Sequence, residues 1–428
     1  RAPYKKNYKE NFSSGNHFHN VLCLSEAKGM NINMKIYPFS LQEDIADEKL
    51  LIYGASIGGE ILLSLLRRRQ IPVWGVCDRF KYDWDFCGYK VMKPEDALKE
   101  EKISVLVTGT RAFNSIIQFL DSYPNIKVYE ISDFIQNNDI CCEEISFDKL
   151  AVEDYKKKYQ YYVDEYQKDD EIILPTFDLC ISEACNLRCK DCSALVPYLS
   201  KRNTYSAEDI MEDFKKIGKV VNHIIELVIV GGEPFIYKEL DKLLYFFQSQ
   251  EYIDEISVVS NGTVFPSETA VKALQLSKVR VRISDYDLET QKINQLKTFF
   301  EEHHINYYIQ KLDFWLDMGQ PVKRNYAPTE LAQLFRDCAF SRSQGLLDGR
   351  IYRCLHAAEI YKLNEVEIKE KEDYIEIRNN GKSYDELKKD LKHYLFDIDS
   401  IVLCDYCSGA KNNIQPAVQL EREKEHEN

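Results

Sequence analysis

Three cysteines lie within eight residues in the run Cys185-Asn186-Leu187-Arg188-Cys189-Lys190-Asp191-Cys192. The run follows residues 176–181, a short and mostly apolar stretch that predicts a buried strand. Iron-sulfur clusters are held by cysteine thiolates and usually take four of them. A compact set of three therefore predicts a cluster with one iron open to a small ligand. A zinc site is the alternative, but it needs a fourth Cys or His, and His223 lies on a different predicted element.

A second motif, Gly231-Gly232-Glu233-Pro234, follows the next predicted strand, residues 226–230. Two glycines let the backbone approach a ligand closely, a carboxylate can pair with an ammonium group, and a proline can fix the turn before a helix that begins near Lys238. Two further predicted strands, residues 256–260 and 279–284, end in polar side chains suited to hydrogen bonds with hydroxyl groups. These strand-end residues are Ser260, Asn261, Ser284 and Asp285.

The cysteine spacing, the Gly-Gly-Glu-Pro motif and the polar strand ends together resemble the radical S-adenosylmethionine (SAM) enzymes. The resemblance implies an α/β fold with a partial (β/α)6 barrel over residues 171–312 and a 4Fe-4S cluster on Cys185, Cys189 and Cys192. It implies that the cluster reduces bound SAM, and that the resulting 5′-deoxyadenosyl radical abstracts a hydrogen atom from the substrate. Family members commonly have an aromatic residue where this chain has Asp191, so adenine packing is expected to differ here. The SAM contacts that the resemblance implies are Gly231, Gly232, Glu233, Pro234, Ser260, Asn261, Ser284 and Asp285.

Four more cysteines lie nearer the C-terminus: Cys338, Cys354, Cys404 and Cys407. Between the first two, Asp348-Gly349 is a dipeptide that favours a tight hairpin turn. This order resembles the twitch subdomain, a shortened relative of the SPASM extension, and it implies such a subdomain over residues 313–418 with one auxiliary 4Fe-4S cluster. Four thiolates leave no iron open, so that cluster is expected to transfer electrons or to hold the subdomain together. A zinc site built from two knuckles is the alternative.

The first third of the chain predicts a Rossmann-like domain over residues 45–145, because short apolar strands alternate with helical patterns. The first strand, residues 49–53, leads into a glycine turn and a helix whose N-terminus is a potential anion site. Residues 88–95 resemble part of the small nucleotide-binding domains attached to sugar acetyltransferases and polysaccharide enzymes. The domain is expected to bind a nucleotide carried by the substrate, to bind NAD, or to serve as a structural or dimerising module. The candidate nucleotide contacts are Gly54, Ser56, Gly59 and Asp78, with Ser56 standing where the dinucleotide fingerprint has its second glycine.

Composition limits the remaining possibilities. The 428 residues carry a formal net charge of −14, which disfavours a nucleic-acid partner. No apolar run approaches the roughly 18 to 20 residues that span a bilayer, and the first residues have no hydrophobic signal core. The odd count of 13 cysteines and their cluster-like spacing predict a reducing cytoplasm. Residues 1–44 are expected to be an extension, residues 146–170 a linker helix and residues 419–428 a charged, disordered tail.

These patterns favour a radical SAM oxidoreductase or epimerase that acts on a nucleotide-linked sugar or similar polyol and draws electrons from a flavodoxin or ferredoxin. Dehydrogenation needs a proton acceptor near the substrate hydroxyl, and the candidates are Asp285 and Asp287, with Arg353 as a polarising partner. A peptide-modifying maturase is one alternative. A non-catalytic electron carrier with two clusters is another, although electron transfer needs no SAM site.

Overall fold

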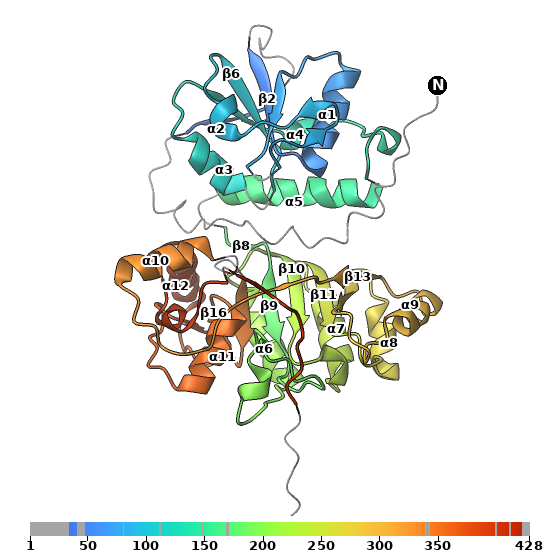
Figure 1. The fold of residues 1–428 in the computed structure, drawn as a ribbon, viewed down its shortest axis with the longest axis vertical. Coiled ribbons are helices and arrows are strands. Elements are labelled where there is room, and N and C mark those ends of the chain that lie inside the picture. Colours follow the sequence, from blue (N-terminus) through green and yellow to red (C-terminus); the bar gives the residue numbers. More distant parts are fainter. Residues whose placement is uncertain are drawn as a thin grey trace, which may run out of the picture. The chain divides into compact units, whose positions relative to one another are not determined.

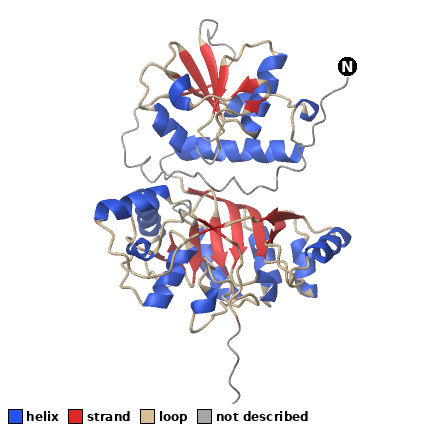
Figure 2. Cartoon of the chain, viewed as in Figure 1, coloured by secondary structure: helices blue, strands red, loops and turns tan. Residues whose placement is uncertain are grey.

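The computed structural model describes residues 34–40, 48–79, 81–110, 113–147, 149–167, 171–338, 340, 343–398, 400–410 and 412–421. The predicted tail beyond Glu421 and most of the predicted extension lie outside these residues. The chain divides into two compact units, of which the first ends at Glu171 and the second begins at Ile172. Figures 1 and 2 show each unit as a layer of strands with helices around it. Within the described residues, no helix is both long enough and apolar enough to cross a membrane.

The first unit contains a five-stranded parallel sheet with the strand order β1-β7-β6-β2-β3. From β2 the chain passes to β3 on one side and then to β6 on the other, so the carboxyl ends of β2 and β6 form the topological switch point of the sheet. The elements are β1 Ile36–Pro38, β2 Lys49–Tyr53, α1 Ile57–Arg68, β3 Gly75–Cys77, β4 Asp85–Phe86, β5 Tyr89–Lys90, α2 Pro94–Ala97, β6 Ile103–Val107, α3 Phe113–Leu120, β7 Lys127–Glu130, α4 Ser132–Gln136 and α5 Lys149–Gln167.

Helix α5 differs from the expected linker, because it packs within the first unit against α1, α3 and α4. Its tyrosines recur every three or four residues and so share one helical face. The hydroxyl of Tyr155 donates to the Thr108 carbonyl at 2.9 Å, and that of Tyr159 donates to the Val107 carbonyl. Both side chains are buried. The stripe therefore fastens α5 to the end of β6.

The second unit is built on a nine-stranded sheet with the order β13-β12-β11-β10-β9-β15-β16-β17, in which β8 also pairs with β10. Strands β9 to β13 are all parallel and are joined through helices, as right-handed crossovers require. The elements are β8 Ile173–Leu174, β9 Phe177–Cys180, α6 Ala207–Ile217, β10 His223–Val230, α7 Leu240–Gln248, β11 Ile253–Ser260, α8 Glu268–Leu274, β12 Val279–Asp285, α9 Ile293–Glu302, β13 Tyr307–Lys311, β14 Trp315–Leu316, α10 Pro328–Asp337, β15 Gln344–Leu347, β16 Arg350–Tyr352, α11 Leu355–Asn364, β17 Ile375–Glu376, α12 Tyr384–Phe396 and β18 Asn413–Ile414.

Within the described part of this unit, the consecutive parallel run has five strands rather than the six of the expected barrel. The segment after β13 forms only the two-residue strand β14, which pairs antiparallel with β18. Asp317, Gly319 and Pro321 follow closely, and such residues favour turns over a continuing strand. A sixth parallel neighbour comes instead from later in the chain, where β15 pairs with β9 on the opposite side.

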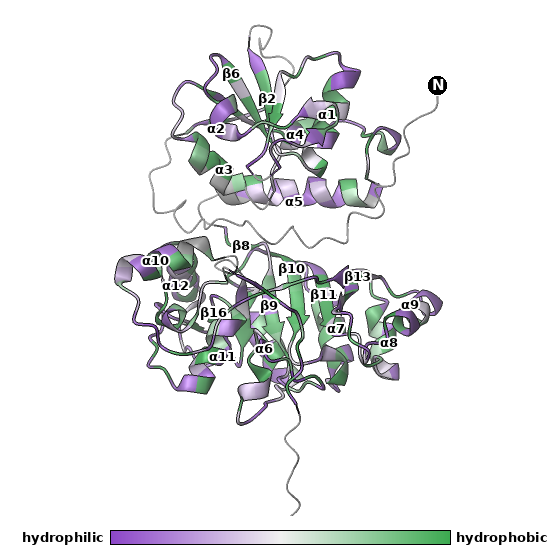
Figure 3. Cartoon of the chain, viewed as in Figure 1, coloured by the Kyte–Doolittle hydropathy of each residue, from purple (hydrophilic) through white to green (hydrophobic). Residues whose placement is uncertain are grey.

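The two faces of this sheet differ in polarity. Phe177 of β9 packs with Phe214 of α6, and Phe214 packs with Phe247 of α7 at a ring separation of 4.7 Å. Figure 3 shows the mainly hydrophobic colouring of β9, β10 and β11. Because side chains alternate along a strand, the opposite face carries a second set of residues, and many of these are polar. That polar set is Asp178, Glu226, Glu255, Ser257, Arg280 and Arg282.

Candidate functional site

The three cysteines of the opening run lie in the loop that follows β9, and the structure brings them close to one another. The thiols influence one another electrostatically, and burial is the main cause that raises the pKa of Cys185 to about 11 and that of Cys189 to about 12. Buried thiols with raised pKa values are protonated at neutral pH unless a cation displaces the proton. The donor set therefore fits a bound metal centre.

Polar N–H groups point at these sulfur atoms. The backbone N–H of Leu187 donates to Cys185 Sγ at 3.4 Å, and the Asn261 amide lies 3.8 Å from the same atom. The amide of Gln419 donates to Cys189 Sγ at 3.2 Å. Such donors stabilise the thiolate form, as they do around cluster-bound cysteines. The sequence does not indicate this role for Gln419, which is the first residue of the predicted charged tail.

The glycines of the Gly-Gly-Glu-Pro motif are required by contact with the cysteine loop. A Cβ atom on Gly231 would lie 2.3 Å from the Ser182 carbonyl oxygen, and one on Gly232 would lie 2.0 Å from the Ala184 carbonyl oxygen. The backbone N–H groups of Gly232 and Glu233 donate to these two carbonyls at 2.6 and 2.8 Å. The motif is thus held directly beside the loop that carries the cysteines.

Glu233 joins the ends of β10 and β11. Its carboxylate accepts the backbone N–H of Asn261 at 2.7 Å and that of Phe235 at 3.1 Å, and it also interacts with the Ser260 hydroxyl. Burial is the main cause that raises the pKa of Glu233 to about 7, and these hydrogen bonds oppose the rise. Pro234 is buried next to it and begins a 3-10 helix, Pro234–Ile236. Four of the predicted SAM contacts therefore meet here: Glu233, Pro234, Ser260 and Asn261.

Gln291 was not singled out from the sequence, yet its side chain joins the ends of β11 and β12. Its amide N–H group donates to the Asn261 carbonyl at 2.8 Å and to the Ser284 carbonyl at 2.7 Å. Its oxygen accepts the backbone N–H groups of Tyr286 and Leu288. No local motif marks such a glutamine, because its partners come together only when the strands align.

The aromatic side chains of Tyr286 and Trp315 pack edge to face at 5.4 Å and lie against the first cysteine group. Two predicted catalytic residues flank Tyr286. Asp285 ends β12 and its carboxylate accepts the Asp287 backbone N–H at 3.0 Å, while Asp287 is exposed and has a positive φ of 59°. This local turn accounts for their positions, and their catalytic role stays a prediction.

The four C-terminal cysteines also converge. The charges of Cys338, Cys354 and Cys407 all act on Cys404, and burial is the main cause that raises its pKa well above the ordinary value. Backbone N–H groups of Phe340, Ala357 and Gly409 each approach the nearest cysteine sulfur at 3.4 Å. In the described part of the chain, no three Cys, His, Asp or Glu side chains gather around a single-ion position.

The hairpin predicted between Cys338 and Cys354 is confirmed. Strands β15 and β16 are antiparallel, and the two turn residues both have positive φ angles, 47° for Asp348 and 77° for Gly349. Arg353 lies at the end of this hairpin and is only 2% exposed. Its guanidinium stacks on the Phe335 ring and donates to the carbonyls of Tyr394 and Leu395 at the end of α12. These contacts anchor Arg353 between α10 and α12, and its role as a polarising partner stays a prediction.

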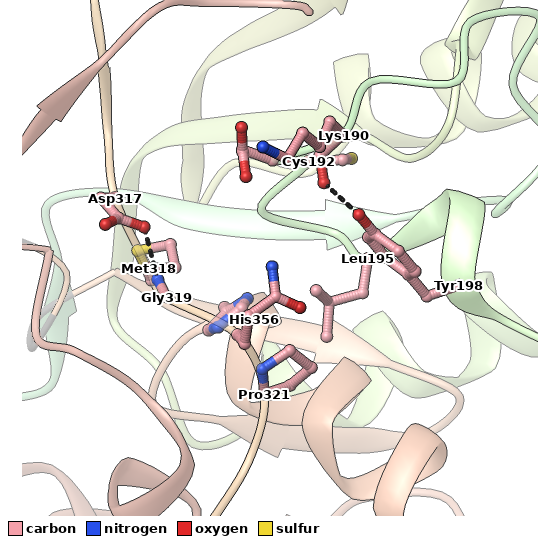
Figure 4. A pocket seen from close by; sticks show the side chains of 11 residues that line it. Lys190, Cys192, Leu195, Tyr198, Asp317, Met318, Gly319, Pro321 and His356 are labelled. Atoms are coloured by element: carbon pink, nitrogen blue, oxygen red, sulfur yellow. Dashed lines mark hydrogen bonds between the residues drawn. The ribbon is translucent and has the colours of Figure 1, made fainter. Parts of the chain in front are cut away.

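A small pocket lies beside the first cysteine group. Figure 4 shows Cys192, Leu195, Asp317 and His356 among the side chains that line it. His356 Nδ1 is 2.6 Å from the Ser193 carbonyl, so Nδ1 is the donor, and Nε2 has no partner within the described residues. Burial lowers the pKa of His356. A neutral histidine thus connects the Cys192 loop to α11, which begins directly after Cys354.

The polar face of the sheet was not predicted, although the alternating Arg280 and Arg282 of β12 could have indicated it. Arg280 pairs with Glu226 at 3.2 Å and with Glu255 at 3.0 Å. Asp178 is only partly exposed, and burial is the main cause that raises its pKa to about 7, with Arg282 opposing and Glu226 reinforcing the rise. Asp178 also acts electrostatically on Cys354 of the second cysteine group.

In the first unit, the predicted nucleotide contacts Gly54, Ser56, Gly59 and Asp78 do gather at the switch point of the sheet. Backbone groups of the glycine turn already form hydrogen bonds with nearby side chains of the protein. The Asp78 carboxylate accepts the Ala55 N–H at 3.0 Å, and the Lys81 ammonium donates to the Ala55 carbonyl at 2.8 Å. A Cβ on Gly59 would lie 2.2 Å from the Gly54 carbonyl oxygen, so this glycine is needed for packing within the protein.

Comparison with known proteins assigns the central region. Residues 179–302 match the Radical SAM superfamily. A GTP 3′,8-cyclase of Clostridium acetobutylicum is 28% identical over 150 residues, covering 34% of this chain and 45% of that protein. The corresponding enzyme of Aquifex aeolicus is 23% identical over 170 residues, covering 38% and 52%. The chain thus spans about half the length of the curated relatives that it matches.

Two solved structures match parts of this chain. BtrN in complex with AdoMet and 2-DOIA is 14% identical. The match covers 58% of this chain and 100% of the BtrN chain, with a TM-score of 0.36. Streptococcus suis SuiB bound to S-adenosylmethionine is 18% identical, covers 39% and 41%, and has a TM-score of 0.28. The family match shows that this chain contains a radical SAM domain. Domains of this class use SAM and a 4Fe-4S cluster.

Replacing Gly232 with alanine is expected to disrupt the cysteine loop, because the new Cβ would meet the Ala184 carbonyl oxygen at 2.0 Å. Iron content per chain after anaerobic reconstitution should fall, and the thermal unfolding midpoint should drop. Gly381→Ala is the matched control, since a Cβ there meets nothing within 4 Å and the positive φ of 61° costs only about 1 kcal/mol. Normal iron content in Gly232→Ala would contradict the assigned role of the motif.

Proposed function

We propose that this protein is a radical SAM enzyme with two 4Fe-4S clusters that removes hydrogen from a small, polar, hydroxylated substrate. The observation that carries the proposal is the pairing of β15 with β9. It joins the element that leads to the first cysteine group with the hairpin that leads to Cys354. The loop that carries the first cysteine group and Cys354 of the second group therefore both follow strands of one continuous sheet, whose polar face includes Asp178.

The residues present fit both clusters. Cys185, Cys189 and Cys192 would hold the first, which supplies the radical chemistry when SAM is bound. Cys338, Cys354, Cys404 and Cys407 would hold the second with no iron left open. The SAM contacts we propose are those around Glu233, Ser260 and Asn261, where the ends of β10 and β11 are tied together.

The polar sheet face favours a nearly uncharged substrate. This face carries three carboxylates and only two guanidinium groups, and the guanidinium of Arg280 already pairs with Glu226 and Glu255. A nucleoside triphosphate, as the name of the GTP 3′,8-cyclases implies for those relatives, would meet little free positive charge here. A hydroxylated sugar or polyol would find hydrogen-bonding groups at Asp178 and Arg282. We therefore retain a sugar or polyol, free or nucleotide-linked, as the proposed substrate class.

Dehydrogenation of an alcohol can be assigned to groups of this chain. After one hydrogen atom has been removed from the carbon, the substrate radical must lose one electron and its hydroxyl proton to become a carbonyl compound. A 4Fe-4S cluster held by the second cysteine group would accept the electron, and Asp178 in its ionised form would accept the proton. Epimerisation is the other outcome, in which a hydrogen atom is returned to the opposite face.

Iron and sulfide counting tests the two-cluster proposal directly. After anaerobic reconstitution we expect about eight iron and eight sulfide per chain. Cys404→Ala should lower both to about four while leaving SAM cleavage to 5′-deoxyadenosine under dithionite. Cys180→Ala is a matched control, because this buried cysteine belongs to neither group. About four iron in the unmodified chain would refute the second site, and absence of SAM cleavage would favour a non-catalytic electron carrier.

The role of Asp178 can be tested with a panel of UDP-sugars and free aminocyclitols that is screened for faster 5′-deoxyadenosine formation. For any compound that is converted, Asp178→Asn should lower product formation about 10²-fold or more, because an amide cannot take up the proton. Asp313→Asn, an exposed aspartate, is the control and should be unaffected. Turnover of Asp178→Asn within twofold of the unmodified chain would exclude this residue as the base.

Nucleotide binding by the first unit can be tested by thermal unfolding of the full chain. UDP, UDP-glucose and NAD are titrated separately, and a ligand at 100 times its Kd should stabilise the unit that binds it by about 2.7 kcal/mol. We expect a shift with UDP-glucose and none with NAD, since Ser56 replaces a fingerprint glycine. No shift with any of the three would indicate a structural module.

A further inference from the structure

The segment that follows β18 returns to the first cysteine group and lies antiparallel against it. The backbone N–H of Lys190 donates to the Val418 carbonyl at 2.7 Å, and that of Leu420 donates to the Arg188 carbonyl at 2.8 Å. Cys189 and Gln419 are the paired residues between these two bonds. Residues 417–420 therefore form a short strap over the loop, where the sequence had predicted the start of a disordered tail.

The strap is anchored by apolar contact as well as by these bonds. Ala417 has no exposed surface and packs with Leu187 and Cys189 in a small cluster of buried residues. The two backbone hydrogen bonds and the packing of Ala417 together limit how far the strap can move relative to Cys189. The side chain that follows this anchor by two residues is Gln419.

The amide of Gln419 is fixed at three points. Its oxygen accepts the Arg188 backbone N–H at 2.9 Å, and its nitrogen donates to the Ala417 carbonyl at 2.7 Å and to Cys189 Sγ at 3.2 Å. Exchanging the oxygen and the nitrogen would place an acceptor against a carbonyl and a donor against an N–H group. The donor is therefore aimed at the cysteine sulfur by the geometry of its other partners.

We propose that Gln419 is a positioning residue for the first cluster, which it serves by donating a hydrogen bond to a ligating sulfur. The inference rests on the proposed function, because it presumes a cluster on Cys185, Cys189 and Cys192. Hydrogen bonds to cluster sulfurs and limited solvent exposure both tune the reduction potential. A donated N–H favours the more negative, reduced state, so the Gln419 amide raises the potential of this cluster.

The test uses the full chain with Cys404→Ala as background, so that the first cluster dominates the signal. Gln419→Ala removes the amide, and Gln419→Glu keeps an acceptor for Arg188 N–H but places a carboxylate oxygen at the sulfur. Gln415→Ala is the control, since Gln415 is exposed in the same segment. The measurement is the midpoint potential from a dithionite titration followed by electron paramagnetic resonance, together with iron content.

We expect a more negative potential in Gln419→Ala, a larger negative shift with reduced iron content in Gln419→Glu, and no change in Gln415→Ala. Hydrogen exchange at the Lys190 and Leu420 amides shows whether the strap is still paired in each variant. Unchanged potentials in both Gln419 variants, with normal iron content, would overturn this inference while leaving the proposed function intact. Failure of the background chain to bind iron at all would overturn both.

Discussion

The structure of the second unit depends on a close passage between two loops, the one after β9 and the one after β10. Their backbones approach so closely that Gly231 and Gly232 have no room for a Cβ atom, and two N–H groups of one loop donate to carbonyls of the other. The loop after β10 therefore holds the backbone of the cysteine loop in place. Glu233 extends the connection to β11, and Gln291 extends it to β12. These hydrogen bonds thus bring the polar ends of β10, β11 and β12 together beside the cysteine loop.

Electrostatics gives this arrangement its chemical character. The thiols of both cysteine groups are buried or partly buried, burial raises the pKa values of Cys185, Cys189 and Cys404, and several N–H groups point at the sulfurs. Protonated thiols leave those N–H donors with poor acceptors, whereas thiolates bound to iron would satisfy them. The carboxylates and guanidinium groups of the sheet face lie on the same set of strands.

Much of the second unit could be predicted because its signals are local. Cys-x3-Cys-x2-Cys, the Gly-Gly-Glu-Pro motif and the Asp348-Gly349 turn are short, and the strands before them are apolar runs. In two segments, by contrast, the structure depends on contacts between residues far apart in the chain. Residues 146–170 predict a linker helix because they are dense in Lys, Asp, Glu and Tyr, and the contacts of α5 with Thr108 and Val107 show where its tyrosines pack. Gln419 precedes the charged residues that begin at Glu421, and its amide donates to the sulfur of a cysteine 230 positions earlier.

The sequence by itself determined which chemistry this protein is equipped for, because cysteine spacing and glycine placement are properties of a few adjacent residues. It also identified the strands, whose apolar runs are needed for burial in a parallel sheet. Only the tertiary structure decided which separate segments share a site. The pairing of β15 with β9, the polar face around Asp178 and the strap over Cys189 arise from contacts between residues far apart in the chain. Sequence patterns report local geometry, and such contacts are set only when strands align and loops meet.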